Sequence, residues 1–269
     1  MTERVANILS IAGSDPSGGA GIQADLKAIS ANGGYGMAAV TGLTAQNTQG
    51  VQGVELVAPE FVATQVRSIR DDIRVDAVKI GMLGTAEIIK AVTESLEGLE
   101  VPVVLDPVMV AKGGDRLLHA EAVAALRDVL LPRATIITPN LPEAADLLDE
   151  DEACDLDAME RQARALLDLG ARAVLLKGGH MGEAEAVDLL CEGMGMTRLR
   201  APRYETRNTH GTGCTLSSAL ATWLGRGDAL SEAAAKAKDY ISGAIGAADE
   251  LEVGQGHGPV HHFHAVWRD

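Results

Sequence analysis

The sequence is poor in aromatic residues and has few cysteines. Phe, Trp and Tyr together make up 3% of the 269 residues, which is too few for the stacking platforms of single-stranded nucleic-acid binders. The three cysteines, Cys154, Cys191 and Cys214, are widely spaced and form no C-x-x-C pair. This pattern argues against a disulfide framework or a structural zinc site, so each thiol is interpreted on its own.

Basic clusters and long apolar runs are also missing. The net charge is −15 and the pI is near 4.8, which disfavours binding to nucleic acid or to an anionic membrane. No stretch of 18 apolar residues occurs, and residues 1–4 do not lead into a signal-type hydrophobic segment. We therefore expect a cytoplasmic protein, in which an anionic substrate would need a local binding site.

Short apolar runs alternate with segments of helical periodicity along the whole chain. This βαβ pattern predicts an α/β fold with a mostly parallel sheet covered by helices on both faces. No Pro/Ser/Gly-rich linker divides the chain, so we predict one domain over residues 1–269; we expect the acidic segment 149–152 to be an exposed bend. Strands are expected at 8–12, 37–45, 77–80, 101–105, 135–138 and 173–176, helices at 22–32, 61–70, 88–96, 120–130, 158–169 and 230–251, and a hairpin at 186–201.

A glycine-containing segment near the C-terminus is the most informative stretch. Gly211 and Gly213 directly precede a helical pattern, which would present bare backbone N–H groups at a helix N-terminus and form an anion site. At that position the helix dipole would favour the thiolate of Cys214, which could accept a proton or attack. The alternative is an ordinary helix N-terminus with a buried cysteine.

A second glycine-rich segment, residues 13–21, follows the first expected strand. Its Gly19-x-Gly21-x-x-Ala24 pattern formally matches a dinucleotide fingerprint, but the next strand ends without an acidic residue for a ribose. It could instead be a capped turn, or a loop whose bare backbone lets a small substrate approach closely.

Several polar residues follow expected strands, where open α/β sheets place ligands. Gln46 offers a donor and an acceptor side by side, which would match the edge of an aminopyrimidine, although a Gln-Asn pair can simply open a turn. Asp106 and Glu143 would suit Mg²⁺ with retained water, whereas Glu143 alone could be an acid at a helix N-terminus. Lys177 could bind a phosphate or be solvated. Asp25, on the first helix, could be a loop-facing polar group or a ligand partner.

Known nucleotide motifs are absent from the sequence. It has no G-x-x-x-x-G-K-[ST] motif and no protein-kinase motif set. His261, His262 and His264 lack metal-site spacing with a carboxylate, so we expect a tail that folds onto the body. Two glycine segments with carboxylates between them point to phosphoryl transfer.

These segments together resemble the hydroxymethylpyrimidine/phosphomethylpyrimidine kinases, a branch of the ribokinase-like superfamily. The resemblance covers nearly the whole chain. Sugar and nucleoside kinases of that superfamily typically carry Asp where this chain has Cys214. The cysteine therefore favours the pyrimidine-kinase branch, which some pyridoxal kinases closely resemble. The motifs that carry the resemblance lie at 12–25, 45–48, 79–83, 138–144, 177–180, 209–215 and 258–264.

The resemblance implies a ribokinase-like three-layer α/β/α sandwich, usually homodimeric. It also implies ATP- and Mg²⁺-dependent phosphorylation of 4-amino-5-hydroxymethyl-2-methylpyrimidine to its monophosphate and then to its diphosphate, for thiamine biosynthesis. The implied roles are Cys214 as base; Gly211, Thr212, Gly213 and Cys214 as backbone anion hole; Gly13, Asp25, Gln46, Met82 and Val108 as pyrimidine pocket; Asn140, Lys177, Thr209, His210 and Lys238 beside the nucleotide; and Asp106 and Glu143 at Mg²⁺.

Three alternatives stay open at this stage. Pyridoxal kinase belongs to the same branch. A non-catalytic pyrimidine sensor would keep Gln46 and Asp25 without turnover. A dinucleotide oxidoreductase would use Gly19 to Ala24 to bind a nicotinamide cofactor.

Overall fold

The protein is built around one mixed sheet with helices on both sides. The computed structural model describes residues 4–109, 120–179 and 185–267. His180 of the 177–180 motif and residues 1–3 lie outside these ranges. The strands are β1 (Asn7–Ala12), β2 (Tyr35–Val40), β3 (Gly42–Asn47), β4 (Gly50–Leu56), β5 (Ala77–Ile80), β6 (Val103–Leu105), β7 (Ile136–Ile137), β8 (Ala173–Lys177), β9 (Glu185–Glu192) and β10 (Gly195–Pro202).

The main sheet has the strand order β10-β9-β8-β7-β6-β5-β1-β2. All neighbours from β2 through β8 pair in parallel, while β9 is antiparallel to both β8 and β10. The expected mostly parallel sheet and the expected hairpin at 186–201 are therefore confirmed. The strand order reverses direction at β1, and the crevice at such a point is where open α/β sheets bind ligands.

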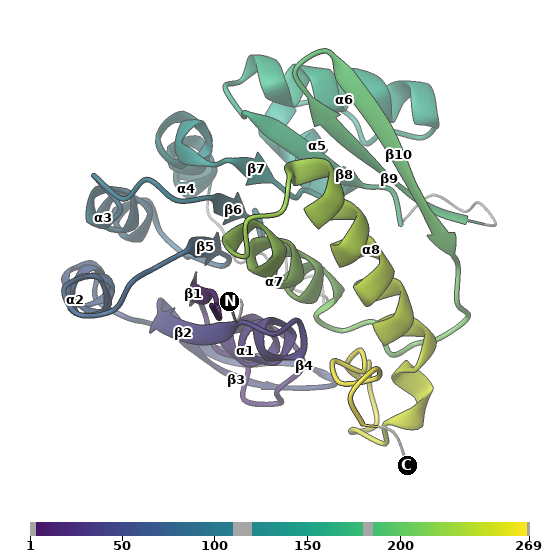
Figure 1. Cartoon of the computed structure of the whole chain (residues 1–269), viewed down its shortest axis with the longest axis horizontal. Coiled ribbons are helices and arrows are strands. Elements are labelled where there is room, and N and C mark those ends of the chain that lie inside the picture. The colour runs from purple at the N-terminus through teal and green to yellow at the C-terminus, as the bar shows by residue number, and fades with distance from the viewer. Residues whose placement is uncertain (1–3, 110–119, 180–184, 268–269) are drawn as a thin grey trace.

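Helices cover the two faces of this sheet unequally (Figure 1). One face carries α1, α7 and α8 and the other carries α2 to α6, and each face has its own apolar core. Successive residues of a strand point to opposite faces. Leu9 and Val78 therefore belong to the core under α2 to α6, while Ile8 and Ala77 belong to the core under α1, α7 and α8. The helices are α1 (Gly21–Ala31), α2 (Pro59–Arg70), α3 (Ala86–Ser95), α4 (Ala120–Ala125), α5 (Leu141–Leu148), α6 (Leu156–Asp168), α7 (Thr212–Gly225) and α8 (Leu230–Gly246).

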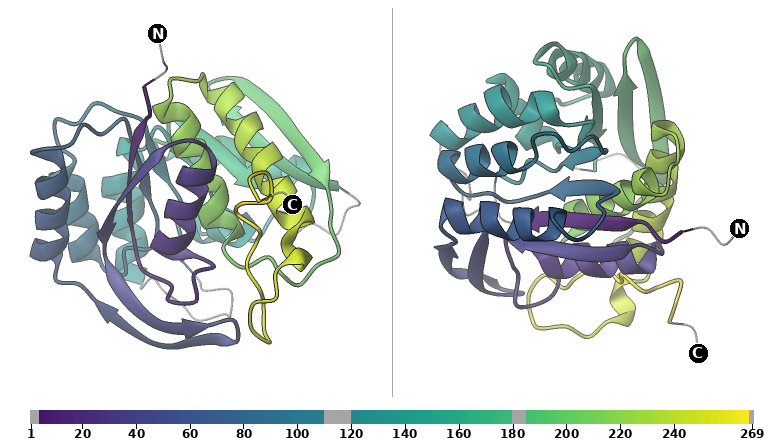
Figure 2. Two further views of the ribbon diagram at one scale, coloured as in Figure 1. Left: turned by 60° about the horizontal axis from the view of Figure 1, so that its bottom comes forward. Right: turned by 60° about the vertical axis from the view of Figure 1, so that its left-hand side comes forward.

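The prediction of one continuous strand at 37–45 is wrong, because this segment is divided between β2 and β3. The chain leaves the main sheet at Thr41, whose hydroxyl donates to the Met82 carbonyl oxygen over 2.6 Å. After this break β3 pairs with β4 in a separate two-stranded antiparallel sheet. The hairpin curves away from the main sheet, as the left view of Figure 2 shows, and it places Thr44, Gln46 and Val51 at the cavity described below.

Two further differences concern helices. The segment expected as one helix at 120–130 is α4 followed by a π-helical turn, Leu126–Leu130. Helix α5 was not among the expected elements, although its start has a capping box: Asn140 and Glu143 exchange backbone-to-side-chain hydrogen bonds of 2.8 Å. The acidic segment 149–152 is exposed, as expected.

The histidine-containing tail folds onto the body, which confirms that expectation. His261 and His262 are buried, and the His262 ring nitrogen lies 3.0 Å from the Thr215 hydroxyl of α7. Within 4–109, 120–179 and 185–267, no three His, Cys, Asp or Glu side chains are grouped so that they could hold a metal ion. In the same residues, no helix has the length and apolar character needed to cross a membrane.

Candidate active site

A cavity of about 800 Å³ opens at the carboxyl ends of the parallel strands. Loops after β1, β5, β6, β7 and β8 line it, together with the start of α7, part of α8 and the β3–β4 hairpin. Segments near both ends of the chain therefore line the same cavity. It brings together every residue that the sequence analysis assigned to a site except Asp25.

The two glycine segments pack directly on each other. Gly211 is the N-cap of α7 with φ +77°, and a Cβ there would lie 1.8 Å from the Gly19 carbonyl oxygen. Gly21 opens α1 with φ +55°, and a Cβ there would lie 2.4 Å from the Gly13 carbonyl oxygen. Glycine is required at both positions by backbone conformation and by space. The first turn of α7 (Thr212, Gly213, Cys214) thus lines the cavity with its backbone N–H groups free of intrahelical partners.

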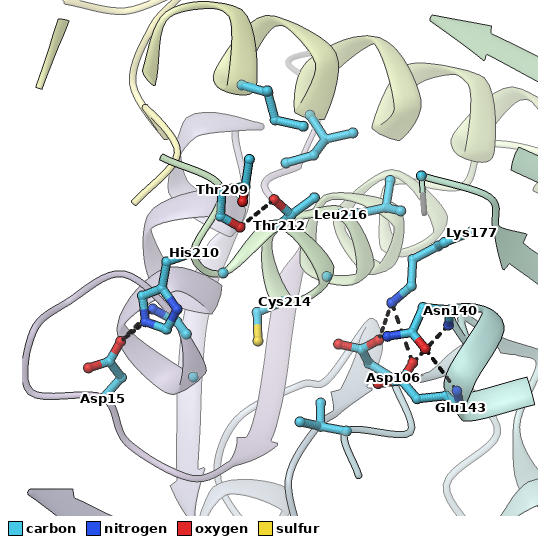
Figure 3. Close-up of a pocket in the computed structure, with 18 of the residues that line it drawn as sticks. Asp15, Asp106, Asn140, Glu143, Lys177, Thr209, His210, Thr212, Cys214 and Leu216 are labelled. Atoms are coloured by element: carbon cyan, nitrogen blue, oxygen red, sulfur yellow. Dashed lines mark hydrogen bonds and ion pairs between the residues drawn. The ribbon is translucent and has the colours of Figure 1, made fainter. Parts of the chain in front are cut away.

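Cys214 lies between two polar clusters in the cavity (Figure 3). Burial raises the pKa of its thiol to about 11, although the Lys79 charge and a hydrogen bond from the Gly21 N–H act in the opposite direction. The prediction that the helix dipole makes Cys214 a resting thiolate is therefore wrong. Desolvation outweighs the favourable charges, and the resting group is a thiol.

Asp25 is the predicted substrate residue that the cavity excludes. Its side chain is fully buried between α1, β1, β5 and α7, where both carboxylate oxygens accept from the Lys79 ammonium at 2.8 and 2.9 Å. The hydroxyls of Ser10 and Ser218 donate to it as well. A carboxylate with this set of partners lies beneath the site and does not hold a substrate heteroatom, so the predicted role is corrected.

Gln46, Asp15 and His210 form the cluster on the hairpin side of Cys214. His210 Nε2 lies 2.8 Å from Asp15 Oδ2 and 3.4 Å from Gln46 Nε2. Burial raises the pKa of Asp15, but hydrogen bonds from His210 and Ser17 more than offset this and lower it to about 2. Asp15 is therefore ionised and accepts from His210 Nε2, which leaves that nitrogen unable to accept from Gln46. The Gln46 amide keeps hydrogen-bonding capacity for a ligand.

The same contacts fix the orientation of His210, for which the resemblance implies a place beside the nucleotide. Its ring points toward Asp15 and Gln46, and it lies across Cys214 from the cluster of Asp106, Glu143 and Lys177 (Figure 3). Thr209 lies just before the start of α7, where its carbonyl oxygen accepts from the Thr212 hydroxyl over 2.7 Å.

The second cluster joins Asp106, Glu143 and Lys177. The Lys177 ammonium lies 3.1 Å from Asp106 Oδ1 and 3.9 Å from Glu143 Oε2, and Thr138 donates to Asp106 over 3.0 Å. Burial raises the pKa of Glu143 to about 7, despite the Lys177 charge and with a further increase from Asp106. The pKa of Asp106 is lowered because Lys177 and Lys79 more than offset its burial.

This cluster has the chemistry of a divalent-cation site. Two buried carboxylates at adjacent strand ends already have a cation, Lys177, between them. Two carboxylates that leave most coordination positions to water and phosphate oxygens suit Mg²⁺. Asp106 and Glu143 therefore fit the ion that the resemblance implies.

The remaining part of the cavity was not found from the sequence. Apolar side chains of α7, α8 and β10 line it, namely Leu216, Ile241, Ile245, Ala201 and Pro202. Lys238 lies at this end, with its ammonium 2.7 Å from Asp188 Oδ2, and Asp188 Oδ1 accepts from the Gly178 N–H. The resemblance already implies a role for Lys238, whereas the apolar residues fit ordinary strand and helix core patterns, so nothing in the sequence distinguishes them from packing residues.

Comparisons with known proteins agree with this geometry. A family model described as phosphomethylpyrimidine kinase matches residues 15–261. The chain is 53% identical to a protein of Escherichia coli (strain K12) named hydroxymethylpyrimidine/phosphomethylpyrimidine kinase, over 97% of this chain and 98% of that protein.

Solved structures of related kinases align with most of the chain. A phosphomethylpyrimidine kinase from Clostridium difficile 630 aligns with a TM-score of 0.79 and 43% identity, over 89% of this chain and 99% of that one. Pyridoxal kinase from Bacillus subtilis, solved as an ADP complex, aligns with a TM-score of 0.89 and 39% identity, over 96% and 98%. The predicted ribokinase-like α/β/α sandwich is confirmed, and the chain belongs to the phosphomethylpyrimidine kinase family.

Proposed function

We propose that this protein phosphorylates 4-amino-5-hydroxymethyl-2-methylpyrimidine with ATP, first to the monophosphate and then to the diphosphate, in thiamine biosynthesis. One observation carries this function: Cys214 and the Gly211–Gly213 backbone lie between two clusters. The cluster of Gln46, Asp15 and His210 can bind a ring, and the cluster of Asp106, Glu143 and Lys177 fits Mg²⁺. Both reactions transfer a γ-phosphoryl group, and one cavity of about 800 Å³ can hold the pyrimidine and the nucleotide phosphates together.

The pyrimidine would bind at the hairpin side of the cavity. Gln46 would hold the ring edge, while Gly13, Met82 and Val108 line the same region. Gly13 leaves room there, since a Cβ would lie 2.5 Å from the Met82 methyl carbon. The β3–β4 hairpin would help to exclude water from the bound ring.

The nucleotide would extend from the anion hole toward α8. Its base would lie against the apolar residues Leu216, Ile241 and Ile245, with Lys238, Thr209 and Asn140 along the phosphates and ribose. Asp106 and Glu143 would hold Mg²⁺, which neutralises charge on the transferring phosphoryl group when bound. Lys177, which lies between those carboxylates, would bind the negatively charged phosphates.

In the first reaction the hydroxymethyl oxygen attacks the γ-phosphorus, its O–H bond breaks, and the bond from phosphorus to the ADP oxygen breaks. The thiolate form of Cys214 would accept the proton and become a thiol, and the N–H groups of residues 211–214 would stabilise the charge on the phosphoryl oxygens. In the second reaction the attacking oxygen belongs to the monophosphate.

A product assay with purified protein tests this function. With ATP, Mg²⁺ and hydroxymethylpyrimidine, we expect the monophosphate to appear first and the diphosphate later. Binding of the pyrimidine with no consumption of ATP would support a pyrimidine sensor instead. A fluorescence change on titration with a nicotinamide cofactor would support the oxidoreductase alternative.

Pyridoxal phosphorylation is a second candidate function. The structural similarity to Bacillus subtilis pyridoxal kinase, at a TM-score of 0.89, favours it. The same assay with pyridoxal in place of the pyrimidine separates the two by their kcat/KM values.

Replacement of Gln46 by leucine should raise KM for the pyrimidine much more than KM for ATP. The amide matches a ring edge, and loss of a matched partner leaves buried polar groups unsatisfied at roughly 1–3 kcal/mol each, which corresponds to about 5- to 160-fold in KM. Gln52→Leu, on the same hairpin but exposed, is the control and should leave both KM values near wild type. Unchanged pyrimidine kinetics in the Gln46 variant would remove Gln46 from the site.

We further propose that the chain acts as a single domain and assembles as a homodimer. Exposed apolar residues on the outer parts of the hairpin and its neighbours, Leu43, Val54, Leu56 and Phe61, support association of two copies. Sedimentation velocity measures the oligomeric state directly.

A further inference from the structure

A fully buried ion pair lies beneath the candidate active site and plays no part in the binding steps proposed above. Lys79 of β5 and Asp25 of α1 have no exposed side-chain surface. Lys79 Nζ donates to both Asp25 oxygens, at 2.8 and 2.9 Å. Placing two charges in the interior is unfavourable unless their mutual attraction and their hydrogen bonds offset the lost hydration. A pair kept in this position therefore needs a reason beyond packing.

The hydrogen bonds of this pair connect it to the helix that carries Cys214. Ser218 follows Cys214 by one helical turn on α7, so both side chains face the sheet. The Ser218 hydroxyl donates to Asp25 Oδ1 over 2.8 Å. On the sheet side, Ser10 donates to Asp25 Oδ2 over 2.6 Å, and Ser10 and Lys79 are register partners on β1 and β5.

Space for the ammonium is also built into the chain. A Cβ at Gly81 would lie 2.8 Å from Lys79 Nζ and 3.0 Å from the Ala12 methyl group. A side chain at residue 81 would therefore press on the ammonium that Asp25 holds. Lys79 borders the cavity floor, where Cys214 and Asp106 are also found.

Charged side chains of both signs surround the Cys214 thiol. Lys79 of β5 and Lys177 of β8 favour the thiolate, while Asp25 of α1 and Asp106 after β6 disfavour it. Lys177 is held by Asp106 and Glu143 in the second cluster. Lys79 is the positive charge with the largest effect on Cys214, and Asp25 fixes its position.

We propose that Lys79 is a positioning residue for the kinase reaction: held by Asp25, its ammonium stabilises the negative charge of Cys214 whenever that thiol is deprotonated. The proposal rests on the proposed function for its catalytic meaning, but the electrostatic effect exists in the protein alone. It also gives Asp25 a role, since the carboxylate that does not reach the substrate holds the cation in place. The two partners of one ion pair then have opposite effects on Cys214.

This opposition defines the experiment. In a Cys154→Ser background, which removes the exposed thiol, the rate of Cys214 alkylation by iodoacetamide is followed by mass spectrometry from pH 6 to 10. At each pH, Lys79→Met should slow alkylation on the order of tenfold, because one pKa unit changes the thiolate fraction tenfold. Asp25→Asn keeps an amide oxygen that can accept from the Lys79 ammonium but removes the negative charge, so it should accelerate alkylation by a similar factor. A merely structural pair would give changes of one sign, since both variants loosen the same packing.

Controls keep the result interpretable. Arg74→Met removes a second ion pair near β5, in which Arg74 Nε lies 2.6 Å from Asp76 Oδ1, and it should leave the alkylation profile unchanged. If Lys79→Met does not fold, the double variant Lys79→Met/Asp25→Asn replaces it, and its alkylation should be slower than that of Asp25→Asn alone. Shifts of the same sign in the two single variants, or no shift in either, would overturn the proposal.

The outcome is separable from that of the proposed function. Opposite shifts in a protein that phosphorylates neither the pyrimidine nor pyridoxal would support the electrostatic role and reject the kinase assignment. Active kinase with shifts of one sign would do the reverse. A split in kinetics adds a second readout: Lys79→Met should lower kcat of the alcohol step while KM for ATP stays within about twofold.

Discussion

Substitution of Gly211 by alanine should reduce both phosphorylation steps by about 10²–10³-fold. Loss of one preorganised donor to a developing oxyanion typically has this effect. The Gly211 Cβ would lie 1.8 Å from the Gly19 carbonyl oxygen, and the φ of +77° disfavours any side chain. The start of α7 must therefore move away from the N-terminal glycine loop, and with it the N–H groups that would face the phosphates. Both steps transfer the same group, so they should be affected equally.

Gly227→Ala is the matched control. Gly227 follows the other end of α7 with φ +97°, and a Cβ there would have no neighbour within 4 Å. The two substitutions share a backbone penalty of about 1 kcal/mol, but only one disturbs the anion hole. Initial rates for the alcohol and for the monophosphate, with melting temperatures for both variants, provide the comparison. Comparable activity of the two variants would show that the backbone at Gly211 does not form the anion hole.

Much of the fold could be predicted because hydrophobic periodicity is strong where an element is buried on both sides. Strand β5, Ala77–Ile80, is buried at every position and was predicted with its bounds. Strand β4 shows the opposite case. It contains two glycines and is mostly exposed, so its sequence lacks both an apolar run and an apolar alternation. The β3–β4 hairpin is defined by pairing between its two strands, and the local pattern of this segment does not indicate that pairing.

In the site, too, features set by local sequence could be predicted, whereas features set by distant residues could not. Residues at strand ends could be assigned to the cavity, because parallel strands bring their carboxyl ends to one edge of the sheet. The side to which His210 points and the burial of Asp25 depend on partners 195 and 54 residues away, respectively. Sequence spacing could place Asp25 on α1 but could not show that Lys79 would neutralise it.

Cys214 is the most consequential case of this kind. Its place at a helix N-terminus was predictable, and a helix dipole does favour a thiolate. Burial depends on the whole cavity and raises the pKa from 9.0 to about 11. The group that is to accept a proton therefore starts as a thiol, and the small thiolate fraction that does form is a stronger base than an ordinary cysteine.

This combination predicts how the first phosphorylation depends on pH. The thiolate fraction rises about tenfold per pH unit below the pKa of about 11, so kcat/KM for the alcohol should rise with pH from 7 to 9 with a slope near one in logarithmic units. The monophosphate has a second pKa of about 6 and is already ionised at neutral pH. Its kcat/KM should therefore be nearly flat over the same range.

Replacement of Cys214 by alanine should then separate the two reactions. The alcohol must lose a proton as it attacks, so its phosphorylation should slow by about 10²–10⁴-fold, which is the usual contribution of a positioned base. The monophosphate step needs no base and should lose much less, because alanine keeps the backbone of residues 211–213 in place. The slope of the alcohol profile should also disappear in the variant. Equal losses in the two steps, with the slope retained, would mean that Cys214 shapes the anion hole and that another group accepts the proton.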